Sequence, residues 1–170
     1  MRRFAAAVFL LALLASGPGP VWAQAAPVCG LDQPVAAGHG EWLRGFAEEI
    51  GLARIEAFVR VSSTVHRTGD LPDCYLTKDE ARDEGWRRGR NLWRHAPGAA
   101  IGGDRFYNRE RRLPAAHDSA YREADLDYEG GRRGARRMVF VLGSDGRWLQ
   151  WVTLDHYRSF VRVPAPKNEP

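Results

Sequence analysis

The basic residues of this 170-residue chain include almost no lysine. Of 25 Lys and Arg residues, only Lys78 and Lys167 are lysine, and Lys167 belongs to a Pro-rich polar tail, residues 164–170. The formal net charge of +4 is too small to indicate a nucleic-acid partner by itself, and arginine clusters are common on solvated surfaces. Lys78 therefore stands out as a compact point charge among guanidinium groups.

The sequence also lacks a long apolar run. Its apolar stretch, residues 4–15, is shorter than the roughly 20 residues that a membrane-spanning helix needs. A positively charged start precedes this stretch and residues 21–23 fit a small-residue cleavage site, so we predict that residues 1–23 are a secretory signal peptide. The remaining 147 residues suit one compact domain, which we expect to be exported, monomeric and free of the membrane.

Cysteine is equally scarce, with Cys29 and Cys74 as the two examples. In an exported protein an even count favours a disulfide, and two unpaired thiols are the alternative. A bridge would close a loop of about 46 residues and stabilise the fold by up to roughly 4 kcal/mol. Two cysteines without matching His or Cys spacing argue against a zinc site, so we expect no metal and no cofactor.

The first half of the chain has helical patterns. Residues 24–54 read as an N-terminal extension ahead of a domain spanning residues 55–163. Thr77 and Glu80 form a capping-box pattern that opens a short helix and places Lys78 in its first turn. Helices are expected at residues 42–50, 55–65 and 77–85, with one further turn at 91–95.

The second half has strand patterns. Asp145-Gly146 is a hairpin signal, and the short connections favour antiparallel pairing. Two or three helices followed by a five-stranded antiparallel sheet define an α+β fold. The expected strands are residues 100–105, 120–127, 135–142, 147–154 and 157–163. Alternation along the second strand is expected to place Tyr121, Glu123, Asp125 and Asp127 on one face and Arg122, Ala124, Leu126 and Tyr128 on the other.

Two carboxylates and two arginines form the first candidate site. Glu123 and Asp125 share a strand face, and Arg133 and Arg137 can fold back over it from the next strand. The plain interpretation is a surface ladder of salt bridges, which is common and contributes little. The chemical interpretation is that Glu123 takes a proton while the guanidinium groups hold a phosphate.

A histidine completes this site. His156 lies in the turn between the last two expected strands, which brings it near the central strand that carries Glu123. A single histidine in a turn is often only solvent-exposed. In the chemical interpretation, His156 returns the proton that Glu123 removes.

Many short motifs together resemble one family, the barnase-like guanyl-specific ribonucleases of bacteria. The resemblance covers about residues 55–163, and its motifs recur in the family's order at nearly its spacing. The motifs are residues 71–81, Gly85-Trp86, Asn91-Leu92, residues 96–98, residues 101–104, Phe106, Asn108-Arg109-Glu110, Leu113-Pro114, residues 122–125 and Asp155-His156-Tyr157.

The resemblance implies a role for each matching residue. Glu123 matches the general base and His156 the general acid, and Asp125 looks like the buried partner that orients the arginines. The groups at the scissile phosphate are then Arg133, Arg137, Lys78 and Arg109. The implied substrate-binding residues are Phe106, Asn108, Arg109, Glu110 and Tyr157, with the Glu110 carboxylate accepting hydrogen bonds from guanine. Among the departures, Tyr121 replaces a tryptophan and Arg132 replaces an aromatic residue.

The implied activity is that of a secreted, metal-independent endoribonuclease that cuts single-stranded RNA 3′ of guanosine through a 2′,3′-cyclic phosphate. An acidic, barstar-like inhibitor protein is implied as a partner by the family alone. A catalytically silent RNA- or polyanion-binding module on the same fold is the alternative from another class. A metal-dependent nuclease is disfavoured, because the carboxylates are few.

Overall fold

The computed structural model describes residues 28–114 and 121–165. The predicted signal peptide and Lys167 lie outside these residues. The described helices are α1 (His39–Glu49), α2 (Ile55–Thr68), α3 (Lys78–Asp83) and the 3-10 helix η1 (Leu92–Arg94). The strands are β1 (Tyr75–Leu76), β2 (Ala100–Arg105), β3 (Arg122–Asp125), β4 (Arg137–Leu142), β5 (Trp148–Thr153) and β6 (Val161–Arg162).

One sheet joins the described strands in chain order, from β1 to β6. Neighbouring strands from β2 to β6 are antiparallel, whereas β1 and β2 run parallel. The predicted α+β class is confirmed. The sheet has one strand more than the five expected. The additional strand is β1, which the sequence did not predict because two residues are too few to show an alternating pattern.

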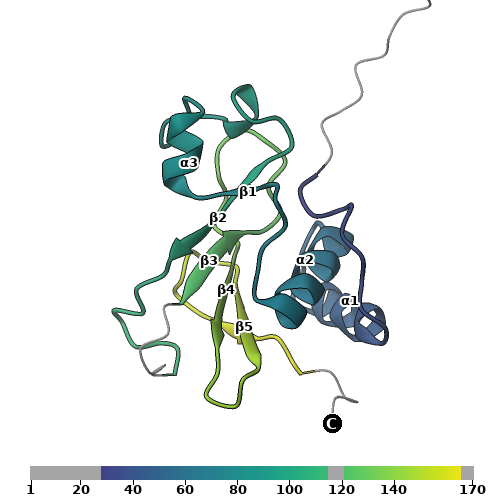
Figure 1. Ribbon diagram of the computed structural model, residues 1–170. Helices are drawn as coiled ribbons and strands as arrows, with labels where there is room; N and C mark the ends of the chain where they lie inside the picture. The colour runs from purple at the N-terminus through teal and green to yellow at the C-terminus, as the bar shows by residue number, and fades with distance from the viewer. Residues whose placement is uncertain (1–27, 115–120, 166–170) are drawn as a thin grey trace, which may run out of the picture.

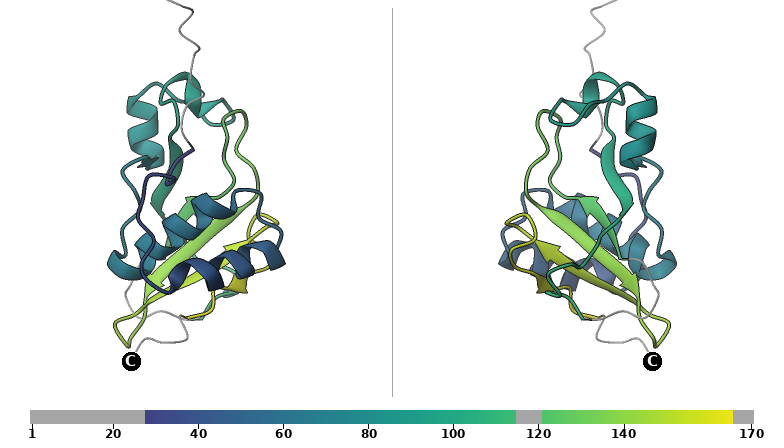
Figure 2. Two further views of the ribbon diagram at one scale, coloured as in Figure 1. Left: turned by 90° about the vertical axis from the view of Figure 1, so that its right-hand side faces the viewer. Right: turned by 90° about the vertical axis from the view of Figure 1, so that its left-hand side faces the viewer.

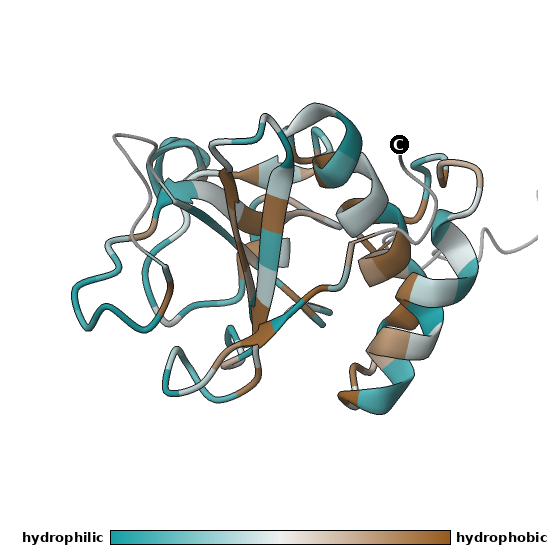
Figure 3. Ribbon diagram, turned by 90° about the horizontal axis from the view of Figure 1, so that it is seen from below, coloured by the Kyte–Doolittle hydropathy of each residue, from teal (hydrophilic) through white to brown (hydrophobic). Residues whose placement is uncertain are grey.

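α1 and α2 form a layer on one face of this sheet (Figures 1 and 2). Phe58 of α2 packs on Phe46 of α1, with ring centroids 5.8 Å apart, and both belong to the main apolar core. The strands contribute Met138, Phe140 and Val152 to that core. Apolar segments accordingly run along both the strands and the helices in Figure 3. Within the described residues no helix is long and apolar enough to cross a membrane.

The end of α2 fits closely against the sheet. Gly69 has a φ of 77°, and its N–H donates to the Val65 carbonyl oxygen at 2.8 Å. A Cβ at this position would lie 1.9 Å from Cζ2 of Trp148 on β5. Gly69 is therefore required both for the left-handed cap and for the approach of the indole ring.

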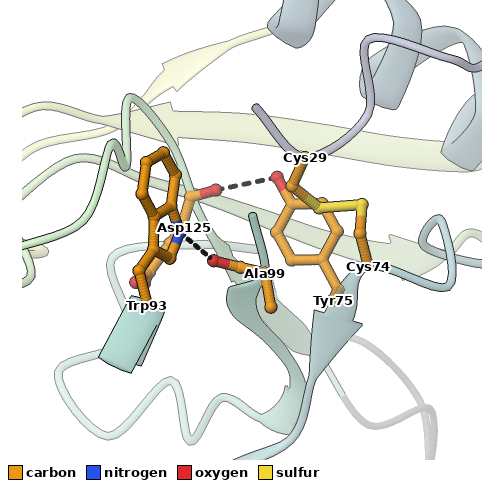
Figure 4. Close-up of a disulfide and its surroundings, with 6 residues drawn as sticks. All are labelled: Cys29, Cys74, Tyr75, Trp93, Ala99 and Asp125. Atoms are coloured by element: carbon orange, nitrogen blue, oxygen red, sulfur yellow. Dashed lines mark hydrogen bonds between the residues drawn. A yellow bond between two sulfur atoms is a disulfide. The ribbon is translucent and has the colours of Figure 1, made fainter. Parts of the chain in front are cut away.

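A disulfide ties the start of the described chain to the sheet edge. Cys29 and Cys74 are bonded, and their Cα atoms lie 5.5 Å apart. Tyr75, next to Cys74, donates its hydroxyl hydrogen to the Asp125 carbonyl oxygen at 2.9 Å (Figure 4). Trp93 of η1 donates in the same region to the carbonyl oxygen of Ala99, so the bridge lies among buried side chains.

Two sequence expectations about strands were wrong. Asp127 leaves the strand with a φ of 56°, and its carboxylate accepts from the backbone N–H groups of Ala53 and Arg54 instead of sharing the face of Glu123. The last strand is Val161–Arg162 and not residues 157–163, because the Asp155 carboxylate holds the preceding segment in a turn.

Candidate active site

A cleft of about 640 Å³ opens on the sheet face opposite α1 and α2. Alternation explains its position, since Ala124 and Met138 point into the helix-covered core while Glu123 and Arg137 point the other way. Among the described residues that line it, seven are Lys or Arg and one is a carboxylate. The lining residues are Lys78, Arg82, Trp86, Arg88, Arg105, Phe106, Tyr107, Arg109, Glu123, Arg133, Arg137, His156 and Tyr157.

Glu123 is buried at the floor of this cleft, and both of its oxygens have partners. Lys78 Nζ donates to Oε1 at 2.6 Å and the Tyr157 hydroxyl donates to Oε2 at 2.5 Å. Burial first, and then the hydrogen bond to Glu123, raises the pKa of Tyr157 well above its ordinary value. The phenol therefore stays protonated and acts as a donor that fixes the carboxylate.

The local structure around α3 places the Lys78 ammonium beside the Glu123 carboxylate. The Thr77 hydroxyl accepts from the Glu80 N–H, and the Glu80 carboxylate accepts from the Thr77 N–H, so the predicted capping box is present. Asp104 Oδ2 accepts from the backbone N–H of Lys78 at 3.1 Å and lies 3.3 Å from its Nζ. The ammonium is thus held between carboxylates from β2 and β3.

Asp125 organises the two arginines. Arg133 donates from Nε and Nη2 to its two oxygens at 2.6 and 2.7 Å, a bidentate contact. Arg137, directly opposite Asp125 in the β3–β4 pairing, has Nε 2.8 Å from Oδ1, without the alignment of a hydrogen bond. Burial is the largest single influence and would lower the pKa of Arg133, but the hydrogen bonds to Asp125 together with the negative charges of Asp125 and Glu123 outweigh it, so the pKa is raised.

The Arg137 guanidinium is also fixed from its other end. Its Nη1 donates to the backbone carbonyl oxygens of Gly134 and Arg136 at 2.9 and 2.7 Å. The side chain is only 4% exposed, against 17% for Arg133. Two charged planar groups are therefore held rigidly beside Glu123, with Arg133 the more open to a ligand.

His156 enters the cleft from an unusual turn. His156 and Tyr157 both have positive φ, 58° and 70°, a conformation that costs residues other than glycine roughly 1–3 kcal/mol and needs support from its surroundings. The His156 N–H donates to the Ala135 carbonyl oxygen at 3.2 Å, and the imidazole lies 4.8 Å from the Tyr157 ring, centroid to centroid. His156 and Glu123 both line the cleft.

Asp155 supports this turn. Its Oδ1 accepts from the Thr153 hydroxyl and from the N–H groups of Arg158 and Ser159 at 2.9 to 3.0 Å, while Oδ2 accepts from the Ser159 hydroxyl at 2.7 Å. These bonds, led by the one from the Ser159 hydroxyl, lower the pKa of Asp155 to about 2. The ionised carboxylate thus stabilises the turn that carries His156 by accepting these hydrogen bonds.

The expected base-binding residues fall into two groups. Phe106 and Tyr157 lie in the cleft with ring centroids 5.1 Å apart, and Arg109 lines it too. Asn108 does not line it: its amide donates to the Leu113 carbonyl oxygen and its Oδ1 accepts from the Leu113 N–H, which closes the loop. Glu110 is exposed and pairs with Arg112 at 2.6 Å.

Sequence reasoning missed several lining residues. Tyr107 is 58% exposed, and the guanidinium carbons of Arg105 and Arg109 lie 5.0 and 5.4 Å from its ring centroid. An exposed aromatic ring between two arginines is a stacking surface for a flat ligand. The pattern Arg–x–Tyr–x–Arg at residues 105–109, where a strand continues into a loop, was the sequence signal that could have identified this surface. Arg82, Trp86 and Arg88 were also missed, and α3 and the segment after it bring them to the cleft.

A cationic cleft that contains one buried carboxylate and one exposed histidine is typical of proteins that act on phosphodiesters. Residues 59–164 match a family model described as ribonuclease. The chain is 46% identical over 113 residues to a ribonuclease of Bacillus intermedius, covering 66% of this chain and 67% of that protein. It is also 46% identical over 112 residues to a ribonuclease of Heyndrickxia coagulans, covering 65% and 99%. The chain therefore belongs to the ribonuclease family, of the barnase-like microbial kind, and is an endoribonuclease.

Proposed function

We propose that this endoribonuclease cuts single-stranded RNA on the 3′ side of guanosine in two metal-independent steps. The observation that carries the proposal is that Glu123 and His156 line one cleft, with Lys78, Arg133 and Arg137 around the space between them. A base, an acid and fixed cations are the groups that this reaction needs.

In the first step Glu123 removes the proton of the ribose 2′-hydroxyl. The freed oxygen attacks the adjacent phosphorus, and His156 protonates the departing 5′-oxygen. A 2′,3′-cyclic phosphate forms, and the downstream strand leaves with a 5′-hydroxyl. DNA lacks the nucleophile and is expected to bind without being cut.

In the second step the two groups exchange roles. His156 removes a proton from water, the water oxygen attacks the cyclic phosphate, and Glu123 protonates the departing 2′-oxygen. The product is a guanosine 3′-phosphate, and both side chains return to their starting protonation states.

The surrounding cations stabilise the extra negative charge that develops at phosphorus in both steps. Arg133 and Arg137 are already held by Asp125, so little reorganisation is needed when the charge appears. Lys78 adds a point charge at the Glu123 side of the cleft, and Arg109 adds one from the loop. These groups supply the positive charge without a metal ion.

Guanine recognition is assigned to the loop after β2. The Asn108 side chain closes this loop and so fixes its shape beside Phe106 and Tyr157. On binding, the Glu110 carboxylate would leave Arg112 and accept hydrogen bonds from the N1–H and amino groups of guanine.

We further propose that the protein is secreted as a monomer after loss of residues 1–23, with residues 24–54 preceding the catalytic domain. An acidic barstar-like protein is proposed as its inhibitor.

The test is the incubation of an RNA that contains a single guanosine with the protein in the presence of a chelator. We expect cleavage after that guanosine, with a cyclic phosphate first and a 3′-phosphate later, and no cleavage of the matching DNA. Glu123→Gln and His156→Ala are each expected to lose about 10²–10⁴-fold in rate. Glu48→Gln, at an exposed position of α1, is the matched control and should cleave normally.

Three results would contradict the proposal in different ways. Ends at other nucleotides would refute guanine preference, and loss of activity with chelator would refute metal independence. RNA that stays intact but bound, with the same affinity for DNA, would indicate a silent polyanion-binding module.

A further inference from the structure

A second basic groove of about 590 Å³ lies beside the catalytic cleft. Its polar walls come from the segment that contains η1 and from the loop between β3 and β4. The described lining residues include three exposed arginines and no carboxylate. They are Gly89, Arg90, Asn91, Arg94, His95, Gly131 and Arg132.

The three arginines differ from those basic surface residues that form ion pairs. Arg44, Arg54 and Arg112, for example, each pair with a carboxylate. Within residues 28–114 and 121–165, by contrast, no carboxylate lies within 4.0 Å of the guanidinium nitrogens of the three in the groove. Like charges gathered without counter-charge repel one another and attract an anion.

The floor of this groove is rigid. Asn91 Oδ1 accepts from the Trp93 N–H at 2.9 Å, and the Tyr128 hydroxyl accepts from the Leu92 N–H at 2.9 Å and donates to the Gly131 carbonyl oxygen at 3.2 Å. A Cβ on Gly130 would lie 3.0 Å from Cε3 of Trp93, so the two walls pack closely. The arginine side chains are long and can adapt to a ligand, but their backbone positions are fixed relative to one another.

The groove and the catalytic cleft are lined by neighbouring residues of the same two segments. Arg88 lines the cleft and Gly89 the groove, while Arg133 lines the cleft and Arg132 the groove. Consecutive Cα atoms are about 3.8 Å apart, so the backbones that line the two sites adjoin in both segments. Arg133 and Arg132 thus contribute one cation to each of the two adjacent sites.

We propose that this groove is a second phosphate-binding site, which holds the backbone of the same RNA strand beyond the nucleotides that react. The inference rests on the proposed function, because the cleft must hold the scissile phosphate. Arg90, Arg94 and Arg132 bind phosphodiesters through their guanidinium groups. Among the described lining residues His95 is the one ring, so the site binds backbone and is indifferent to base sequence.

The test compares Arg94→Ala/Arg132→Ala with a control of equal charge loss, Arg67→Ala/Arg162→Ala, whose exposed residues lie on α2 and β6. Each is assayed on a guanosine-containing dinucleotide and on a twelve-nucleotide RNA with one guanosine. In the groove variant we expect kcat/KM to fall about tenfold on the longer RNA and to stay unchanged on the dinucleotide. The dependence of log(kcat/KM) on log salt should weaken by about 0.7 for each phosphate that the variant no longer neutralises.

Binding is measured separately from catalysis. A fluorescent twelve-nucleotide DNA, which lacks the reactive hydroxyl, should bind the groove variant about tenfold more weakly than the wild type or the control variant, and thermal melting checks that both variants are folded. Equal affinities of the two variants would overturn the inference, as would an equal loss on both substrates. Failure of the wild type to cleave after guanosine would refute the proposed function and leave this binding comparison decisive for the groove.

Discussion

The ammonium of Lys78 lies 2.6 Å from Oε1 of Glu123, although the two residues are 45 positions apart. Lys78 begins α3 and Glu123 lies in the centre of β3, so their contact depends on how the helix sits at the edge of the sheet. The Tyr157 hydroxyl reaches the second oxygen of the same carboxylate from the turn before β6. Three segments of the chain therefore converge on one proposed base.

The first prediction concerns Lys78. Lys78→Ala is expected to lower kcat by about 10²–10³-fold, because a fixed cation near the developing charge is removed. Lys78→Arg should restore little, since a flat guanidinium does not replace a compact ammonium between two carboxylates. Arg82→Ala removes a cleft-lining cation that already pairs with Asp79 and should have a small effect. Single-turnover rates on a dinucleotide measure all three, and a Lys78→Ala rate near wild type would refute the role.

The second prediction concerns Asp125. Asp125→Ala removes the counter-charge of Arg137, a guanidinium only 4% exposed, and is expected to lower the free energy of unfolding by about 3–5 kcal/mol. Urea unfolding followed by fluorescence measures the loss. Asp73→Ala, at an exposed position, is the control. A loss as small as that of the control would show that the two arginines do not depend on Asp125.

The third prediction concerns pH and Asp155. The pKa of Asp155 falls from 3.8 to about 2 on folding, so its ionised form stabilises the folded state at any pH above about 4. This stabilisation is lost as the pH drops through the folded-state pKa. Asp155→Asn should therefore melt below the wild type at about pH 6, and the difference should shrink at about pH 2.5.

Asp83→Asn, at an exposed position of α3, is the control for this pH series and should melt like the wild type at both pH values. Activity provides a second readout, because Asp155 supports the positive-φ turn that carries His156. A melting difference that stays constant with pH would contradict the role of the ionised carboxylate.

The fourth prediction concerns the disulfide. Cys29→Ser/Cys74→Ser is expected to lower the free energy of unfolding by about 4 kcal/mol, from the entropy of a loop whose ends are 45 residues apart. Activity at room temperature should be kept, because neither cysteine lines the cleft. Reductant should destabilise the wild type and leave the double variant unchanged; equal effects on both would refute the prediction.

Local patterns predicted the elements that depend on neighbouring residues. The apolar periodicity of α2, the capping box before α3 and the turn at Asp145-Gly146 between β4 and β5 are all present. Each relies on contacts within a few positions, so the sequence is sufficient to predict them. The division of the chain at residue 55 remains a prediction.

Elements that depend on distant contacts were missed or placed wrongly. β1 exists because Tyr75 and Leu76 pair with Ala100 and Ile101 of β2, a parallel contact without a local signature. Asp127 was assigned to the wrong face because its backbone turns to meet the N–H groups of Ala53 and Arg54. Neither partner can be read from the residues around it.

The amino-acid sequence by itself determined the fold class, the family and the types of group in the cleft, because periodicity, caps and motif order are local properties of the chain. The tertiary structure decided which of these groups meet. It joined Lys78 and Tyr157 to Glu123, set Arg137 opposite Asp125, and left Asn108 and Glu110 outside the cleft lining. The physical reason is that strand register and the packing of α3 fix distances between residues far apart in the chain, and no local pattern encodes those distances.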